Sequence, residues 1–250
     1  MIDGPLVSVL IANYDSKLFV EAAVESAIGQ SYRNIEIIVV DDCSTDGSWE
    51  VLKELEAKYP RVTVVQNEAN GGEGFTKRRL VNISKGELFG FLDPDDCLVP
   101  EAVEGMVDAH AAMADAGTIH SRQENCDANL ESLGTFTGVP LGKDETLLER
   151  GGSLSHFCTF KRKFYDMTDG IRPGYQLAVD VDLYLKMEEV AAIGFIPEIL
   201  YHYRCHEGGL SQGENDARAY FWCLLARYEA CSDSHFELRF PLLRGVGRGI

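Results

Sequence analysis

The first 120 residues alternate between short apolar runs and longer segments in which apolar residues recur at helical spacing, and this alternation constrains the fold more than any other feature. The run at 35–40 is almost continuously valine and isoleucine, as expected for a strand that is buried on both faces. Alternation of this kind builds βαβ units, so the sequence predicts an α/β fold with a mainly parallel sheet flanked by helices. The predicted strands span 6–12, 35–40, 61–66, 88–92 and 118–120, and the predicted helices span 17–30, 48–59, 74–84 and 100–116.

The second half of the chain is less regular. Residues 122–150 lack a clear period, which predicts loops with small strands. The spacing of apolar residues predicts a helix over 180–190, a strand over 199–203 and an amphipathic helix over 215–231. The tail at 236–250 mixes three arginines with leucine and phenylalanine, and it is either a lipid- or partner-facing segment or a plain surface tail.

Charge and cysteine content narrow the class of protein. The 23 basic and 40 acidic residues give a formal net charge of −17, whereas nucleic-acid binders carry a basic footprint, so we expect no nucleic-acid partner. An acidic protein that binds an anionic substrate needs local cations or a metal to offset its own field. The seven cysteines are odd in number and form no C-x-x-C motif, which favours reduced thiols over a disulfide framework or a zinc ribbon.

The sequence predicts neither secretion nor a membrane span. A strand-like run begins by Leu6 without a basic segment before it, so we expect no signal peptide. No uninterrupted apolar stretch approaches the roughly 20 residues that a membrane span needs. We therefore expect a cytoplasmic protein, either free or in peripheral contact with the inner face of the membrane, and the sequence leaves the oligomeric state open.

Polar and acidic side chains follow three of the predicted strands. These strand ends carry Asn13, Tyr14 and Asp15; Asp41 and Asp42; and Asp93, Asp95 and Asp96 around Pro94. Ligands of open α/β sheets bind beyond the carboxyl ends of the strands, so three such ends indicate a binding crevice. Each aspartate alone could instead be a turn former or a helix N-cap.

The run from Asp93 to Asp96 is the sharpest of these signals. Asp93 and Asp95 are two residues apart, so in extended backbone both carboxylates face the same side. Clustered carboxylates repel one another unless a cation lies among them, and oxygen ligands suit Mg²⁺ or Mn²⁺. The alternative is a solvated acidic turn.

The usual phosphate-binding motifs are missing from the sequence. It holds no G-x-x-x-x-G-K-[ST] and no G-x-G-x-x-G after the first strand, and the glycine-rich segment 70–74 has neither spacing. We therefore expect the chain to bind a diphosphate through a metal or not at all.

Taken in order, these segments resemble the family-two inverting glycosyltransferases of GT-A fold, a group that builds bacterial polysaccharides and lipid-linked glycans. The similarity spans residues 6 to about 211, and the ordered set is specific although its single pieces are not. It is carried by residues 7–11 with Asn13-Tyr14, by 37–46, by 84–87 with 91–96 and Pro100-Glu101, by 179–183, and by Tyr201-His202-Tyr203-Arg204-Cys205-His206 with Ser211.

The resemblance implies roles on the donor side. Asn13, Tyr14 and Asp42 would bind the nucleoside, Tyr14 by stacking on the base and Asp42 by accepting a hydrogen bond from the ring N–H. Asp93 and Asp95 would bind the ribose and a Mn²⁺ or Mg²⁺ ion. The donor would be a nucleotide-sugar, with uridine diphosphate as the preferred carrier. The alternative is a core tyrosine beside an N-cap aspartate.

The resemblance also implies that Asp180 is the catalytic base. Carboxylates are favoured at a helix start by the helix dipole alone, and this alternative explains Asp180 or Asp182 equally. The family often has glutamate before this aspartate, where the chain has Val179. Its usual Arg-Asn pair after the glycine-rich loop is replaced by Lys77-Arg78, and Lys77 can supply the charge but not the planar fork of an arginine.

Two further segments predict ligand contacts. Glycines at 151–152 let backbone approach a ligand closely, so we expect this segment and His156 on the acceptor side, although His156 could equally be a surface histidine. Tyr175 lies near Asp180 in the sequence, so we expect it on the same side. Arg204, His206 and Ser211 suit a diphosphate, and the loop that holds them would close over the donor as a lid. His206 could also supply a nitrogen ligand to the metal. The alternative is a structural Arg204 and an exposed His206.

The resulting hypothesis is a metal-dependent inverting glycosyltransferase that moves a sugar to a saccharide or lipid-linked acceptor. Residues 1–120 would form the nucleotide-sugar-binding half, 121–213 the acceptor-binding half of the same GT-A domain, and 214–250 a C-terminal helix and tail. Two alternatives stay open, a nucleotidyltransferase and a non-catalytic nucleotide-sugar-binding module. The sequence names neither the sugar nor the acceptor.

Overall fold

A computed structural model describes residues 4–142, 144–206, 208–209 and 216–232. In this part of the chain nine strands form one sheet, with β7 (Ser132–Thr137) paired only to β6. The order across the sheet is β3 (Val62–Gln66), β2 (Ile35–Asp41), β1 (Val7–Asn13), β4 (Leu88–Phe91), β8 (Cys158–Lys161), β6 (Ala116–Cys126), β9 (Ala192–Arg204) and β5 (Cys97–Leu98).

The four strands β3, β2, β1 and β4 run parallel, as the strand–helix alternation predicts. The short strand predicted at 118–120 is wrong in length and setting. It extends from Ala116 to Cys126, and β8 lies between it and β4, antiparallel to both. The outer part of β6 is polar and pairs with the exposed strand β7, so no apolar period reveals it.

β9 begins seven residues before the predicted start at 199. Its pairing to β6 passes from Phe195 to Ile199 with a shift of register. Pro197 lies in this irregular stretch, where a residue without an N–H group breaks the ladder least. The proline therefore hides the first half of the strand from a sequence pattern.

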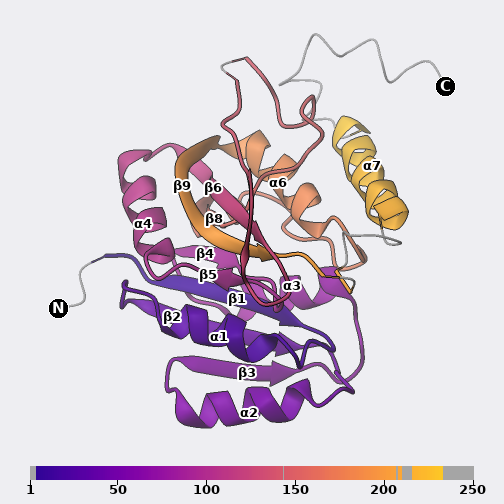
Figure 1. Ribbon diagram of the computed structural model, residues 1–250. Helices are drawn as coiled ribbons and strands as arrows, with labels where there is room; N and C mark the ends of the chain where they lie inside the picture. The colour runs from indigo at the N-terminus through magenta and orange to yellow at the C-terminus, as the bar shows by residue number, and fades with distance from the viewer. Residues whose placement is uncertain (1–3, 143, 207, 210–215, 233–250) are drawn as a thin grey trace.

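Helices cover both faces of the sheet (Figure 1). α1 (Val20–Ile28), α2 (Ser48–Lys58) and α4 (Ala102–Ala112) pack on one face. α3 (Glu73–Ile83), α6 (Val179–Val190) and α7 (Asp216–Ser232) pack on the other, and the single turn α5 (Arg162–Tyr165) follows β8. All the predicted helices are present, with ends shifted by a few residues.

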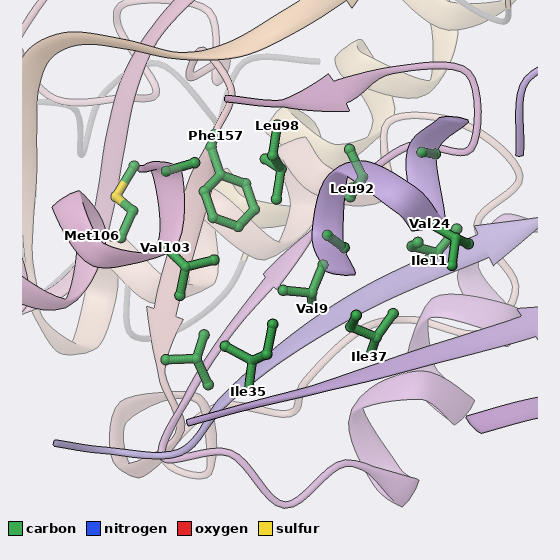
Figure 2. Packing of buried hydrophobic residues seen from close by; sticks show 14 of the residues in the cluster. Val9, Ile11, Val24, Ile35, Ile37, Leu92, Leu98, Val103, Met106 and Phe157 are labelled. Carbon is green, nitrogen blue, oxygen red and sulfur yellow. The ribbon is translucent and has the colours of Figure 1, made fainter. Parts of the chain in front are cut away.

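The central strands are apolar on both sides because each side faces a helical layer. Val9, Ile11 and Ile37 enter the cluster under α1, α2 and α4, as Figure 2 shows, whereas Leu10 and Ile38 enter the cluster under α3 and α6. This double burial explains the unbroken run of valine and isoleucine in β2.

The sheet brings the predicted strand ends to one edge. Asn13 at the end of β1 lies opposite Asp41 at the end of β2, and Asp41 lies opposite Gln66 at the end of β3. On the far side, β5 pairs with β9 so that Cys97 faces His202, which sets the segment 93–96 beside the end of β9.

Candidate functional site

Asn13 and Asp41 fasten the ends of β1 and β2 together. The Asn13 side-chain amide donates to Asp41 Oδ1 at 2.7 Å, and the Ser44 hydroxyl donates to the same oxygen at 2.5 Å. Both Asn13 and Asp41 are buried. Asn13, which the sequence places among the nucleoside contacts, is thus a support of the loop that carries Tyr14.

Asp42 organises the glycine-rich segment before α3. Its Oδ1 accepts hydrogen bonds from the Asn67 amide at 2.6 Å and from Gly71 N at 2.9 Å, and its Oδ2 accepts from Gly72 N at 2.8 Å. Asp42 is buried, and these hydrogen bonds occupy three of the about four acceptor positions of its carboxylate.

Tyr14 is 49% exposed, so its ring is open to solvent at the strand end. The main chain joins Asp42 to the residue before Tyr14, because Asp42 N donates to Asn13 O at 2.7 Å. Tyr14 and Asp42 therefore lie close together at the carboxyl edge of the sheet. The ring of Tyr14 is exposed there, and Asp42 holds the loop at 71–72.

Lys77 lies at the centre of a group of carboxylates. Its Nζ is 2.6 Å from Glu73 Oε1 and 3.8 Å from Asp93 Oδ1, and it lies 5.4 Å from the centre of the Phe91 ring. Burial alone would lower the pKa of Lys77, but Glu73, Asp93 and Asp180 together raise it above its usual value. Lys77 is therefore a fixed cation at the donor edge.

Glu73 is a residue that sequence reasoning missed. Burial raises the pKa of its carboxyl, and Lys77 partly offsets the rise. The signal was available, because an acid and a lysine at i and i+4 on a helix form a pair. Glu73 thus holds the lysine that replaces the arginine of the family.

The three aspartates of the 93–96 segment point into different surroundings. Asp96 is 2% exposed and accepts from the Tyr201 hydroxyl at 2.8 Å and from Arg204 N at 2.7 Å. Burial, with Asp95 and Asp93 nearby, raises the pKa of Asp96 well above its usual value. Asp96 thus ties this segment to β9, whereas the side chains of Asp93 and Asp95 are partly exposed.

His206 and Asp95 form a pair, with Nε2 and Oδ2 2.9 Å apart. Gly208 N donates to His206 Nδ1 at 3.2 Å, which assigns the ring proton to Nε2 and makes the imidazole a donor to Asp95. The predicted association of His206 with the acidic segment is therefore present in the fold.

Arg204 is held by main chain. Its guanidinium donates to the carbonyl oxygens of Asp95 and Ala128, and it lies 4.7 Å from the centre of the Phe19 ring. The Arg204 side chain is only 5% exposed, and its contact with the Asp95 carbonyl supports the main chain of the segment 95–96. Ser211, the last residue of the predicted lid, lies outside the described residues.

The donor set fits one divalent cation. Asp95 Oδ2 and His206 Nε2 face each other, and a cation that bound to both would displace the Nε2 proton. Burial raises the pKa of Asp95, with a further contribution from Asp93. The raised pKa means that the ionised form of Asp95 is disfavoured where it lies. A bound cation would stabilise that ionised form. No group of three His, Cys, Asp or Glu side chains is arranged around one point among the described residues, so the remaining ligands would be substrate oxygens and water.

Asp180 and Asp182 differ in their partners although both begin α6. Asp182 is 3% exposed and forms ion pairs of 2.7 Å with Arg172 and with Lys186. Asp180 instead lines a small pocket together with Lys77 and His156. The fold therefore brings three of the predicted site residues to one cavity.

His156 is fixed by its own backbone. Its N–H donates to Gln123 Oε1 at 2.9 Å, and its ring lies 5.1 Å from the ring of Tyr201. It is half-buried in the wall that faces Asp180.

Tyr175 lies elsewhere. Its hydroxyl donates to Glu229 Oε2 at 2.7 Å, its ring lies 5.2 Å from that of Trp222, and its carbonyl accepts from Gly74 N at 2.9 Å. The pocket wall does not include it. Tyr175 therefore joins α7 and α3.

Comparison with known proteins identifies the family and the fold. The chain matches glycosyl transferase family 2 over residues 8–168. It is 29% identical to a chondroitin synthase of Escherichia coli, over 97% of this chain and 33% of that protein. Its structure is similar to that of S. aureus TarS 1–349 in complex with UDP-GlcNAc, with a TM-score of 0.74 and 19% identity over 91% of this chain and 66% of TarS 1–349.

A further structure is that of the mannosyltransferase PcManGT from Pyrobaculum calidifontis in complex with GDP-Man and Mn²⁺, with a TM-score of 0.60 and 15% identity over 92% of this chain and 74% of that one. The curled, mostly parallel sheet with helices on both faces is thus the GT-A fold of glycosyltransferases. The chain belongs to glycosyl transferase family 2. It spans about a third of the length of the chondroitin synthase that it matches.

Proposed function

We propose that the chain is a metal-dependent glycosyltransferase that moves a sugar from a UDP-sugar to an acceptor hydroxyl in polysaccharide or glycan synthesis. The observation that carries the proposal is a pocket lined by Asp180, Lys77 and His156 together. The UDP-GlcNAc bound to TarS supports this class of donor, and the name of the chondroitin synthase supports a role in polysaccharide synthesis.

On the donor side, residues 1–120 would hold the nucleotide. The exposed ring of Tyr14 would stack on the base, and the remaining acceptor position on Asp42 would meet the ring N–H. Lys77 would face the diphosphate, because Glu73 and Asp93 hold its ammonium at the edge of the crevice. Asp93 would lie next to the ribose.

Asp95 and His206 would hold the cation, Mn²⁺ or Mg²⁺, which supplies Lewis-acid stabilisation of the leaving diphosphate when bound. The nitrogen donor favours Mn²⁺. The Mn²⁺ in the mannosyltransferase structure supports a divalent ion in a fold of this type. Arg204 would act indirectly, by fixing the carbonyl of Asp95.

On the acceptor side, residues 121–213 would place a hydroxyl between Asp180 and the anomeric carbon. Asp180 takes the proton of this hydroxyl. At the same time the hydroxyl oxygen of the acceptor bonds to the anomeric carbon, from the face opposite the diphosphate. The bond from the anomeric carbon to the diphosphate oxygen breaks, and its electron pair leaves with UDP. The product has the inverted configuration. His156 would contact the acceptor, and Asp182 would fix the start of α6.

One incubation separates this proposal from its two alternatives. The full chain is mixed with a panel of UDP-sugars, Mn²⁺ and pyrophosphate, and the nucleotide products are separated by chromatography. A glycosyltransferase releases UDP, with water or an added saccharide as acceptor. A nucleotidyltransferase releases UTP and a sugar phosphate instead, and a binding module releases neither. The absence of UDP at saturating donor contradicts the proposal.

A further inference from the structure

The pocket that Asp180, Lys77 and His156 share has two parts that differ in exposure. Its rim is formed by side chains that are partly exposed, those of Phe91, His156 and Asp180. Its floor is formed by side chains that are at most 3% exposed and belong to the core cluster under α3 and α6. The floor residues are Cys158, Phe160, Ile171, Val179, Leu183 and Tyr184.

The described side chains of the floor offer a ligand no unpaired hydrogen-bonding group. Four of the six are hydrocarbon. The other two, the Tyr184 hydroxyl and the Cys158 thiol, interact with each other, and burial raises the pKa of both groups, so both stay neutral. A sugar hydroxyl placed on this floor would lose its hydrogen bonds to water without gaining others, which is unfavourable.

The pocket is also small. It has room for about one group of the size of a water molecule or a methyl group, so a whole sugar ring does not fit. Its walls are packed, because the rings of Phe160 and Tyr184 stack with centres 6.0 Å apart and the ring of Phe91 lies 6.3 Å from that of Phe160. A ligand therefore reaches the floor only with a small substituent.

The residues around the pocket indicate which part of the substrate meets it. In the proposed reaction the transferred sugar lies between the leaving diphosphate, which Lys77 would face, and the base Asp180. Lys77 and Asp180 both line the pocket and interact electrostatically. A pocket bounded by both groups lies beside the transferred sugar, and this step rests on the proposed function.

We propose that the floor of this pocket selects donors whose transferred sugar carries a substituent that ends in a methyl group. The methyl group passes from water onto hydrocarbon walls and leaves no polar group unpaired. An acetamido group and a 6-deoxy position both present such a methyl group. The amide of an acetamido group would stay at the rim, where Asp180 and His156 are partly exposed.

The test is calorimetric titration of the full chain with three donors in the presence of Mn²⁺. UDP-N-acetylglucosamine carries the acetamido methyl, UDP-6-deoxyglucose carries a methyl on the sugar ring, and UDP-glucose carries neither. An apolar site for one carbon discriminates by ~10–200-fold, so at least one methyl-ended donor should bind tighter than UDP-glucose by on the order of tenfold. The donor that binds tighter identifies the source of the methyl group.

Val179→Ile adds one carbon to the floor and fills the space of the methyl group. It should remove the preference for the methyl-ended donor and leave the affinity for UDP unchanged. Val181→Ile is the matched control, because Val181 is 3% exposed on the same helix but does not line the pocket. This control should keep the preference, and thermal unfolding checks that both variants are folded.

Equal affinity of the parent chain for the three donors, or tighter binding of UDP-glucose, would overturn the methyl site whether or not the variants fold. An unchanged preference in folded Val179→Ile would overturn it as well. Release of UDP tests the proposed function separately. A chain that releases UDP but binds the three donors equally retains the transferase and loses the methyl site, whereas a methyl preference without UDP release does the reverse.

Discussion

At the scale of single residues, substitutions of the two aspartates at the start of α6 should have different effects. One should change catalysis and the other should change stability. Asp180→Asn should lower kcat by ~10²–10⁴-fold, the usual contribution of a general base, and leave UDP affinity unchanged. Asp182→Asn is the matched control, because it removes a charge two residues away that is paired with Arg172 and Lys186. It should lower the free energy of unfolding by on the order of 3 kcal/mol. Steady-state kinetics and urea unfolding of both variants measure these effects, and a loss confined to KM for Asp180→Asn would contradict its role.

Asp95 carries the prediction for the metal. Asp95→Asn should abolish the Mn²⁺-dependent part of UDP binding, because an amide is a weaker ligand than the carboxylate that pairs with His206. Asp96→Asn should instead destabilise the fold, because Asp96 is buried and bonded to Tyr201 and Arg204. Calorimetric titration of UDP in Mn²⁺ and in EDTA measures the first effect. Equal UDP affinity in Mn²⁺ and EDTA for the parent chain would exclude the metal site.

At the scale of elements, the start of α3 depends on one glycine. A Cβ at Gly74 would lie 2.6 Å from the carbonyl oxygen of Tyr175 and would also overlap that of Arg172. Gly74→Ala should therefore destabilise the protein by about 1–3 kcal/mol and loosen the position of Lys77. Gly174 lies between Arg172 and Tyr175, in the loop that Gly74 contacts. A Cβ added at Gly174 has nothing within 4 Å, so Gly174→Ala should be close to neutral. Thermal unfolding compares the two, and an equal effect would mean that the two elements are not in close contact.

The elements that the sequence predicted are those with a period of their own. β1, β2 and α1 to α4 are apolar at regular spacing because each faces a helical or sheet layer. β5 has two residues, too few for a period, and β9 is interrupted at Pro197. The strand ends with Tyr14, Asp42 and Asp93 follow from the parallel order. The separation of Asp180 from Asp182, the support role of Arg204 and the pairing of Glu73 with Lys77 depend on long-range contacts that the residue types alone do not specify.

At the scale of the whole molecule, two buried histidines predict how stability varies with pH. Burial lowers the pKa of His110 to about 3, with a contribution from Lys161, and lowers the pKa of His120 to about 4, with contributions from Arg150 and His156. The unfolded chain binds these protons below about pH 6.5, and the folded chain does not. Their contribution to stability is thus complete above that pH and is lost as the pH falls toward 4 and 3.

Replacing both histidines by glutamine should remove this dependence. Between pH 6.5 and 5.5 the parent chain should lose on the order of 2 kcal/mol that the double variant retains. Urea unfolding at the two pH values measures the difference. Parallel losses in parent and variant would show that the histidines are protonated in the folded protein.

Binding and unfolding experiments test single residues, whereas the stereochemistry of transfer tests the reaction in the pocket directly. The measurement is a proton NMR time course of the full chain with an α-linked UDP-sugar and Mn²⁺, read at the anomeric signals before mutarotation. We predict release of UDP together with a sugar or glycoside that first appears in the β configuration, and no such product with Asp180→Asn. A product that first appears as the α anomer, or unchanged donor at saturation, would contradict transfer with inversion from this pocket.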